Sequence, residues 1–108
     1  IKKIKRIVKN YKNFFIHLDS NHTHEHVLKE LNVYSKFLNK YNYIIADDTI
    51  VSEIPNQIYR PRPWHKNNNP KTAVKEFLKK NRSFKLDLTL NYNHIISSCP
   101  GGYIYKNK

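Results

Sequence analysis

Three carboxylates stand where chemistry could occur, each just after a run of apolar residues. Asp19 follows the run FFIHL at 14–18, and the doublet Asp47–Asp48 follows the run YNYIIA at 41–46. They are three of only eight acidic residues in the chain, which makes their placement notable. Carboxylates that meet repel one another unless a cation lies among them, and Mg²⁺ prefers such oxygen ligands. The alternative is structural, because Asp also caps free backbone N–H groups where strands and turns meet.

A histidine, His22, lies three residues after Asp19 and is the candidate general base. Imidazole ionises near neutral pH, so it can accept a proton from a substrate hydroxyl held by a metal. His24 and His26 follow closely and raise zinc as an alternative. The chain has neither a Cys pair nor an H-E-x-x-H motif to support zinc. We therefore expect His24 and His26 to be early helix residues without a catalytic role.

The periodicity of the surrounding sequence predicts a βαβ unit that positions these side chains. The two apolar runs are typical of buried strands. Between them, apolar residues at helical spacing predict an amphipathic helix over 23–38, with Thr23 as its N-cap. Such a crossover makes the two strands parallel, so both end at the edge where open α/β sheets bind ligands. Adjacent strands lie about 4.8 Å apart, and we expect the three carboxylates to converge.

The rest of the chain predicts helices, a long loop and edge strands. Residues 1–11 form a basic amphipathic pattern, and 54–69 is a Pro- and Asn-rich loop of the kind that is functional or disordered. A helix is expected to start at Pro70 with Asn69 as N-cap and to end at Asn81. Antiparallel strands at a sheet edge are expected in SFKLDLTL (83–90), HIISS (94–98) and YIYK (103–106).

Composition sets the broad class. A chain of 108 residues suffices for one small domain, and it has no apolar run long enough to span a membrane and no signal-peptide pattern. It begins at Ile1 and contains no Met, so we expect a piece of a longer reading frame. The single Cys99 excludes an internal disulfide and predicts a cytoplasmic location. The net charge of +12 leaves open a nucleic-acid-binding module, although no known binding motif supports one and a general Lys-rich bias explains the charge as well.

Four blocks of the sequence, taken in order, resemble one enzyme family. The blocks are LDSNHTHEHVLKEL (18–31), IIADDTIV (44–51), RPW (62–64) with NNPKTAVKEFL (68–78), and PGGY (100–103). From about Tyr11 to the C-terminus, the chain is similar to the cephalosporin hydroxylases and rhamnosyl O-methyltransferases, which are class I S-adenosylmethionine-dependent methyltransferases. The resemblance implies an α/β fold, the C-terminal half of a Rossmann-like domain with a parallel βαβ core and an antiparallel edge hairpin. It implies transfer of a methyl group to a hydroxyl of a sugar, glycolipid or secondary metabolite.

The resemblance also implies roles for individual residues. The family usually has Glu where this chain has Asp47, and glycines where His65 and Asn67 stand, so the loop is expected to differ in shape. Trp64 is expected either to contact substrate or to plug the loop base. The implied roles are Mg²⁺ ligands for Asp19, Asp47 and Asp48, general base for His22, S-adenosylmethionine contacts for Asp19 and Ser20, and substrate-loop contacts for Trp64, Asn68 and Asn69.

One part of the family pattern is missing. Methyltransferases of this class hold the cofactor through a glycine-rich turn, whereas the two glycines here, Gly101 and Gly102, lie near the C-terminus. We therefore expect residues 1–108 to be a partial domain that lacks the N-terminal cofactor-binding half. An open sheet edge would then favour a homo-oligomer or pairing with that half. An inactive remnant of a methyltransferase is the remaining alternative.

Overall fold

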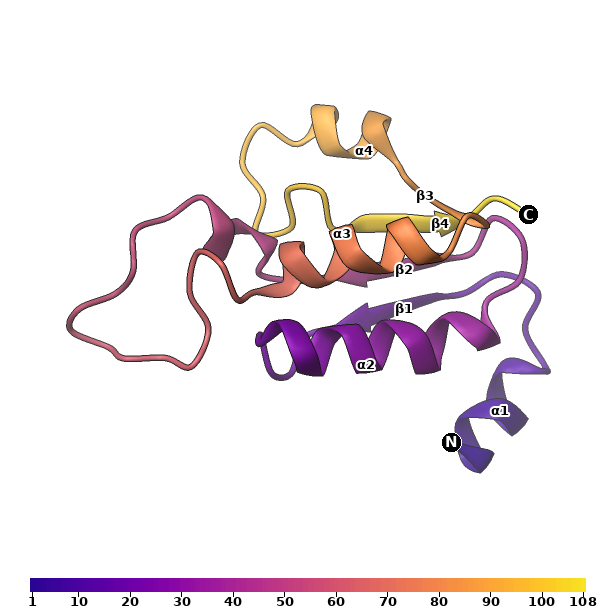
Figure 1. The fold of residues 1–108 in the computed structure, drawn as a ribbon. Helices are drawn as coiled ribbons and strands as arrows, with labels where there is room; N and C mark the ends of the chain where they lie inside the picture. Colours follow the sequence, from indigo (N-terminus) through magenta and orange to yellow (C-terminus); the bar gives the residue numbers. More distant parts are fainter.

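A four-stranded mixed sheet carries two helices on one face (Figure 1). The computed structural model describes all 108 residues. The strand order is β1-β2-β4-β3, in which β1 and β2 are parallel while β4 is antiparallel to both of its neighbours. The elements in chain order are α1 (Lys2–Val8), β1 (Phe15–Leu18), α2 (His24–Tyr34), the 3₁₀ turn η1 (Ser35–Phe37), β2 (Tyr43–Ala46), the 3₁₀ turn η2 (Thr49–Ser52), α3 (Pro70–Lys80), β3 (Phe84–Leu86), α4 (Leu88–Asn93) and β4 (Tyr103–Lys106).

The predicted βαβ unit is confirmed. β1 and β2 pair in parallel, from Phe15 opposite Tyr43 to Leu18 opposite Ala46, and α2 connects them. Helices α2 and α3 lie side by side over the sheet (Figure 1). The expected helix over 23–38 is shorter, because α2 ends at Tyr34 and tightens into η1.

The core lies between these helices and one face of the sheet. Strand residues alternate between the two faces, so every second side chain points at the helices. The other face is less covered, as shown by Phe15, which is 65% exposed at the β1 edge. The buried apolar residues of the core are Leu18, Val27, Leu31, Leu38, Ile44, Ala46, Ala73, Val74, Phe77, Phe84 and Ile104.

The C-terminal third differs from the sequence prediction in two elements and in the position of one strand. The pattern of Leu86, Leu88 and Leu90 resembles a strand, yet only Phe84–Leu86 is one, and Leu88–Asn93 forms α4. Asp87 causes the switch, because its side chain accepts a hydrogen bond from Leu90 N at 2.9 Å and so caps the helix. HIISS forms no strand, and Ile95 and Ile96 lie in solvent. The antiparallel pair β3–β4 exists, but β4 lies inside the sheet and β3 forms its edge.

No helix of the protein has both the length and the apolar character needed to cross a bilayer.

Candidate metal and acid–base site

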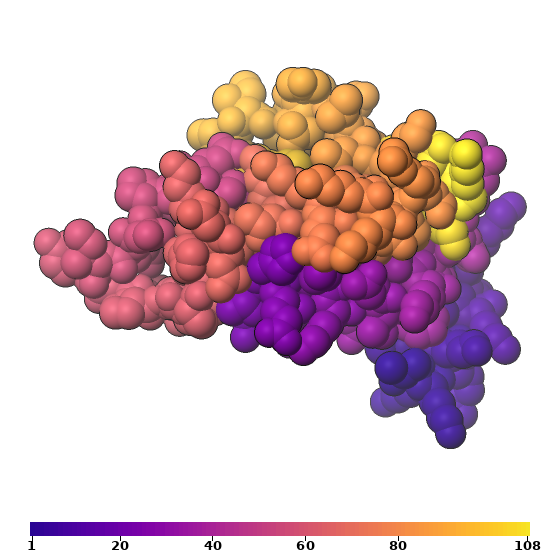
Figure 2. Space-filling model, in the orientation of Figure 1, coloured from indigo at the N-terminus to yellow at the C-terminus, as the bar shows by residue number.

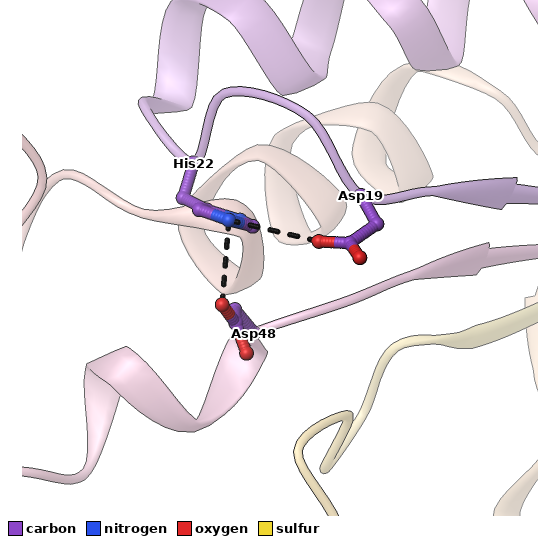
Figure 3. Close-up of side chains that lie close together, drawn as sticks. All are labelled: Asp19, His22 and Asp48. Carbon is purple, nitrogen blue, oxygen red and sulfur yellow. Dashed lines mark ion pairs between the residues drawn. The ribbon is translucent and has the colours of Figure 1, made fainter.

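The ends of β1 and β2 place two carboxylates next to the same nitrogen of one imidazole (Figure 3). His22 Nε2 lies 3.3 Å from Asp48 Oδ2 and 3.8 Å from Asp19 Oδ1. One ligand atom from each of the three residues lies within 4.8 Å of the others. Asp19 comes from the end of β1, Asp48 from the turn after β2, and His22 from the loop that leads into α2. The parallel pairing of β1 and β2 is therefore what brings the three side chains together.

Local backbone geometry aims Asp48 at this group. Its φ is 52°, in the left-handed region that Asp tolerates better than most residues. This conformation ends β2 and begins η2 at Thr49. The imidazole of His22 is itself largely buried and meets the Trp64 ring edge-to-face, with centroids 4.9 Å apart. Trp64 therefore restricts how the His22 ring can turn.

The donor set fits a hard divalent cation. Two carboxylates supply anionic oxygens, and both are accessible to solvent, with exposed side-chain fractions of 57% for Asp19 and 42% for Asp48. Such ligands suit Mg²⁺ or Mn²⁺, and the neighbouring imidazole nitrogen suits a metal ligand or a base. A protonated His22 would compensate the same two charges without a metal. The arrangement can thus bind a cation, or hold a proton, beside an open surface.

Asp47, predicted as a third metal ligand, is placed outside this group. Its side chain accepts hydrogen bonds from Cys99 Sγ at 2.9 Å, Ser98 Oγ at 2.6 Å and the Asp48 backbone N–H at 2.8 Å, and it pairs with His17 Nε2 at 2.9 Å. The left-handed backbone at Asp48 turns that residue toward His22, whereas these four contacts hold the Asp47 carboxylate elsewhere. The expected convergence thus holds for Asp19 and Asp48 and not for Asp47.

These contacts hold Asp47 ionised. Burial opposes its negative charge, but the hydrogen bonds from Cys99, Ser98, the Asp48 backbone and His17 together outweigh burial and hold the pKa of Asp47 well below its ordinary value. Burial, followed by the contact with the Asp47 carboxylate, raises the pKa of the Cys99 thiol to about 11. Because Ser98 and Cys99 belong to the loop that precedes β4, their hydrogen bonds to Asp47 fix that loop in place.

That loop approaches β2 too closely for any side chain at Gly102. A Cβ there would lie 2.2 Å from the carbonyl oxygen of Ala46. Gly101 adopts a φ of 73°, which also favours glycine. The two glycines of the PGGY block therefore allow the loop before β4 to pack closely against the end of β2, next to the site.

The other two histidines bind different partners, so the zinc alternative has no common centre. His24 hydrogen bonds Thr72 Oγ1 at 2.8 Å and Glu76 Oε2 at 2.9 Å, which ties α2 to α3. His26 pairs with Glu30 at 3.4 Å across one turn of α2. Both lie in the first turn of α2, as expected.

Ser20 and the two loop asparagines make structural contacts. Ser20 Oγ donates to Glu30 Oε1 at 3.0 Å. Asn68 Oδ1 accepts from the backbone N–H of His24 at 2.8 Å, and so caps α2 in place of the Thr23 side chain, which makes no capping bond. Asn69 caps α3 in a capping box with Thr72, as its sequence position predicted.

Sequence reasoning missed two arginines of the 54–69 loop, Arg60 and Arg62. They line a cavity next to Trp64, and the Arg62 guanidinium carbon lies 5.3 Å from the centre of the Trp64 ring. The available signal was the segment RPRPW, in which two Arg alternate with prolines in a chain whose other bases are mainly Lys.

Comparison with known protein families assigns the chain to one of them. The family described as rhamnosyl O-methyltransferase/CmcI matches residues 1–107, which is nearly the whole chain. No curated protein and no solved structure matches the chain significantly.

Proposed function

The chain belongs to the rhamnosyl O-methyltransferase/CmcI family, and from this premise we propose that it acts in metal-assisted transfer of a methyl group from S-adenosylmethionine to a hydroxyl. The observation that carries the proposal is the convergence of Asp19, His22 and Asp48 at the ends of two parallel strands. The family supports methyl transfer to oxygen, and the donor set supports Mg²⁺. The acceptor is a small molecule or a glycan.

Each side chain of the group has a role that follows from its contacts. Asp19 and Asp48 would hold the cation, and His22 would accept the proton of the acceptor hydroxyl at Nε2. When bound, the cation lowers the pKa of a nearby hydroxyl, and S-adenosylmethionine supplies the methyl group. Trp64 keeps the imidazole in one orientation, and this favours a productive approach of the hydroxyl.

Matched substitutions of two neighbouring residues, Asp48 and Asp47, test which side chains bind the metal. Asp48→Asn is expected to weaken Mg²⁺ or Mn²⁺ binding by at least about tenfold, because it removes an anionic ligand. The measurement is the melting temperature of the chain during a cation titration, since a ligand that binds only the native state raises it. In the wild type the melting temperature should rise with cation concentration, and in Asp48→Asn this rise should be largely lost. An equal rise in both proteins contradicts the assignment.

Asp47→Asn is the control, with the same change in charge one residue away. It should keep the cation-dependent rise and lower the stability at neutral pH by about 1–2 kcal/mol, because it breaks the contacts to Ser98 and Cys99. The folded state lowers the pKa of Asp47 from its ordinary 3.8, so this stabilisation is present above about pH 4 and is lost as pH falls further. The gap between wild type and Asp47→Asn should therefore close in acid. If this variant lost the cation-dependent rise in melting temperature, Asp47 would be a metal ligand after all.

We also propose that residues 1–108 supply the metal and acceptor side of the site, and that the glycine-rich cofactor turn lies outside them. The outer edge of β1 is unpaired within the sheet, which leaves room for a further strand (Figure 1). Isothermal titration of the 108-residue chain with S-adenosylmethionine is expected to show no micromolar binding. A dissociation constant in that range would mean that the chain holds the cofactor by itself.

A further inference from the structure

A basic cavity lies within the loop that follows η2. The loop projects from one end of the molecule (Figure 2), and residues between Val51 and His65 enclose a cavity of about 300 Å³. No acidic side chain lines it, whereas Arg60, Arg62 and His65 do. The remaining walls are amides, prolines and apolar groups around the Trp64 ring, contributed by Val51, Ile54, Pro55, Asn56, Gln57 and Pro61.

The two arginines have no carboxylate partner. The ion pairs of the protein use Lys or His as the base, and none involves Arg60 or Arg62. Only four of the twenty basic residues are Arg, so a general excess of Lys does not explain why two of them line one cavity. The guanidinium group is the one that binds carboxylate or phosphate through two parallel hydrogen bonds. Pro61 and Pro63 flank Arg62 and limit the freedom of its backbone.

Trp64 is a wall shared by this cavity and the metal site. Its ring lies 4.9 Å from the His22 ring and 5.3 Å from the Arg62 guanidinium carbon. The proposed base and the guanidinium are therefore within about 10 Å of each other. A single sugar-sized molecule can present a hydroxyl to His22 and an anionic substituent to Arg62 while one face rests on the Trp64 ring.

We propose that the acceptor is a hydroxylated molecule with an anionic group, a carboxylate or a phosphate, which Arg60 and Arg62 bind. The proposal rests on the proposed function for the place of the hydroxyl, but the anion site itself requires neither metal nor cofactor. Charge and shape then select the acceptor: the arginines bind its anion, Trp64 supports its ring, and the distance between Arg62 and His22 chooses which hydroxyl reacts.

The only tryptophan of the chain makes this site directly observable. Trp64 fluorescence is followed during titration with glucose 6-phosphate, glucuronate and neutral glucose, in EDTA and without S-adenosylmethionine. Saturable changes are expected with the two charged sugars, with affinities at least tenfold higher than for glucose. The tighter-binding charged sugar shows which of the two anions, phosphate or carboxylate, the arginines prefer.

Two double variants separate the cavity from general charge. Arg60→Gln with Arg62→Gln should weaken binding of the charged sugars at least tenfold. Arg6→Gln with Arg82→Gln removes the same charge outside the cavity and should change binding less than twofold. All four positions are exposed, so the fold should survive, which circular dichroism checks. Equal binding of charged and neutral sugars, equal losses in the two double variants, or no loss in either overturns the proposal. Because no metal or cofactor is present, these outcomes are independent of whether methyl transfer itself is found.

Discussion

His22→Gln lowers the rate of methyl transfer to an alcohol by about 10²–10⁴-fold, the usual contribution of a general base. Glutamine occupies a similar position and can still hydrogen bond, but it cannot take the proton of the hydroxyl. The assay follows the transfer of a labelled methyl group from S-adenosylmethionine to the acceptor. The protein assayed is the product of the longest reading frame that contains this chain. Addition of EDTA should abolish transfer, because the proposed site needs its cation.

A comparison of acceptors tells a base from a residue that merely supports the fold. A phenol loses its proton far more readily than an alcohol, so His22→Gln should cost much less rate with a phenol. A structural defect would slow both acceptors alike. His26→Gln is the matched control, because His26 pairs with Glu30 on α2 and lies outside the metal group. A full-rate His22→Gln enzyme, or equal losses with both acceptors, removes His22 from the proton transfer.

The pairing of the strands could be predicted from sequence, whereas the direction of each side chain could not. Apolar runs separated by a helical pattern require a parallel crossover, and this placed Asp19 and the Asp47–Asp48 doublet at one edge. Which member of the doublet faces His22 depends on the left-handed turn at Asp48 and on the hydrogen bonds that Ser98 and Cys99 donate to the Asp47 carboxylate. Those partners lie about fifty residues away in the chain, and no local pattern reveals them.

The same limit explains the errors near the C-terminus and in the long loop. Alternating Leu86, Leu88 and Leu90 favour a strand, but one capping contact from Asp87 turns the second half into α4. The distant donor to Asn68, the His24 backbone N–H at the start of α2, was equally hidden, whereas the cap of Asn69 on the adjacent helix could be predicted because it is local. Local hydrogen bonds could thus be predicted, and bonds across the fold could not.

Asn69 has the most demanding structural role of the residues first attributed to the substrate loop. Its side chain is fully buried, and its oxygen accepts from the backbone N–H groups of Lys71 at 2.9 Å and Thr72 at 3.3 Å. Its nitrogen donates to the carbonyls of His65 at 2.9 Å and Lys66 at 2.7 Å. One amide therefore joins the end of the loop to the start of α3, and α3 in turn packs against α2 beside the site.

Asn69→Ala is expected to destabilise the protein by about 3 kcal/mol, because it removes a helix cap and the two hydrogen bonds that tie the loop carbonyls of His65 and Lys66 to the start of α3. For a chain of this size the melting temperature should fall by roughly 10 °C or more. Asn68→Ala removes one capping contact at a more accessible position and should cost only about 1 kcal/mol. Asn69→Ser keeps the cap oxygen but cannot reach the loop carbonyls, so its stability should lie between wild type and Asn69→Ala. Urea unfolding followed by circular dichroism measures all three; equal small losses at both positions would mean that the loop does not depend on the Asn69 amide, and that a direct substrate contact is again the better account of this residue.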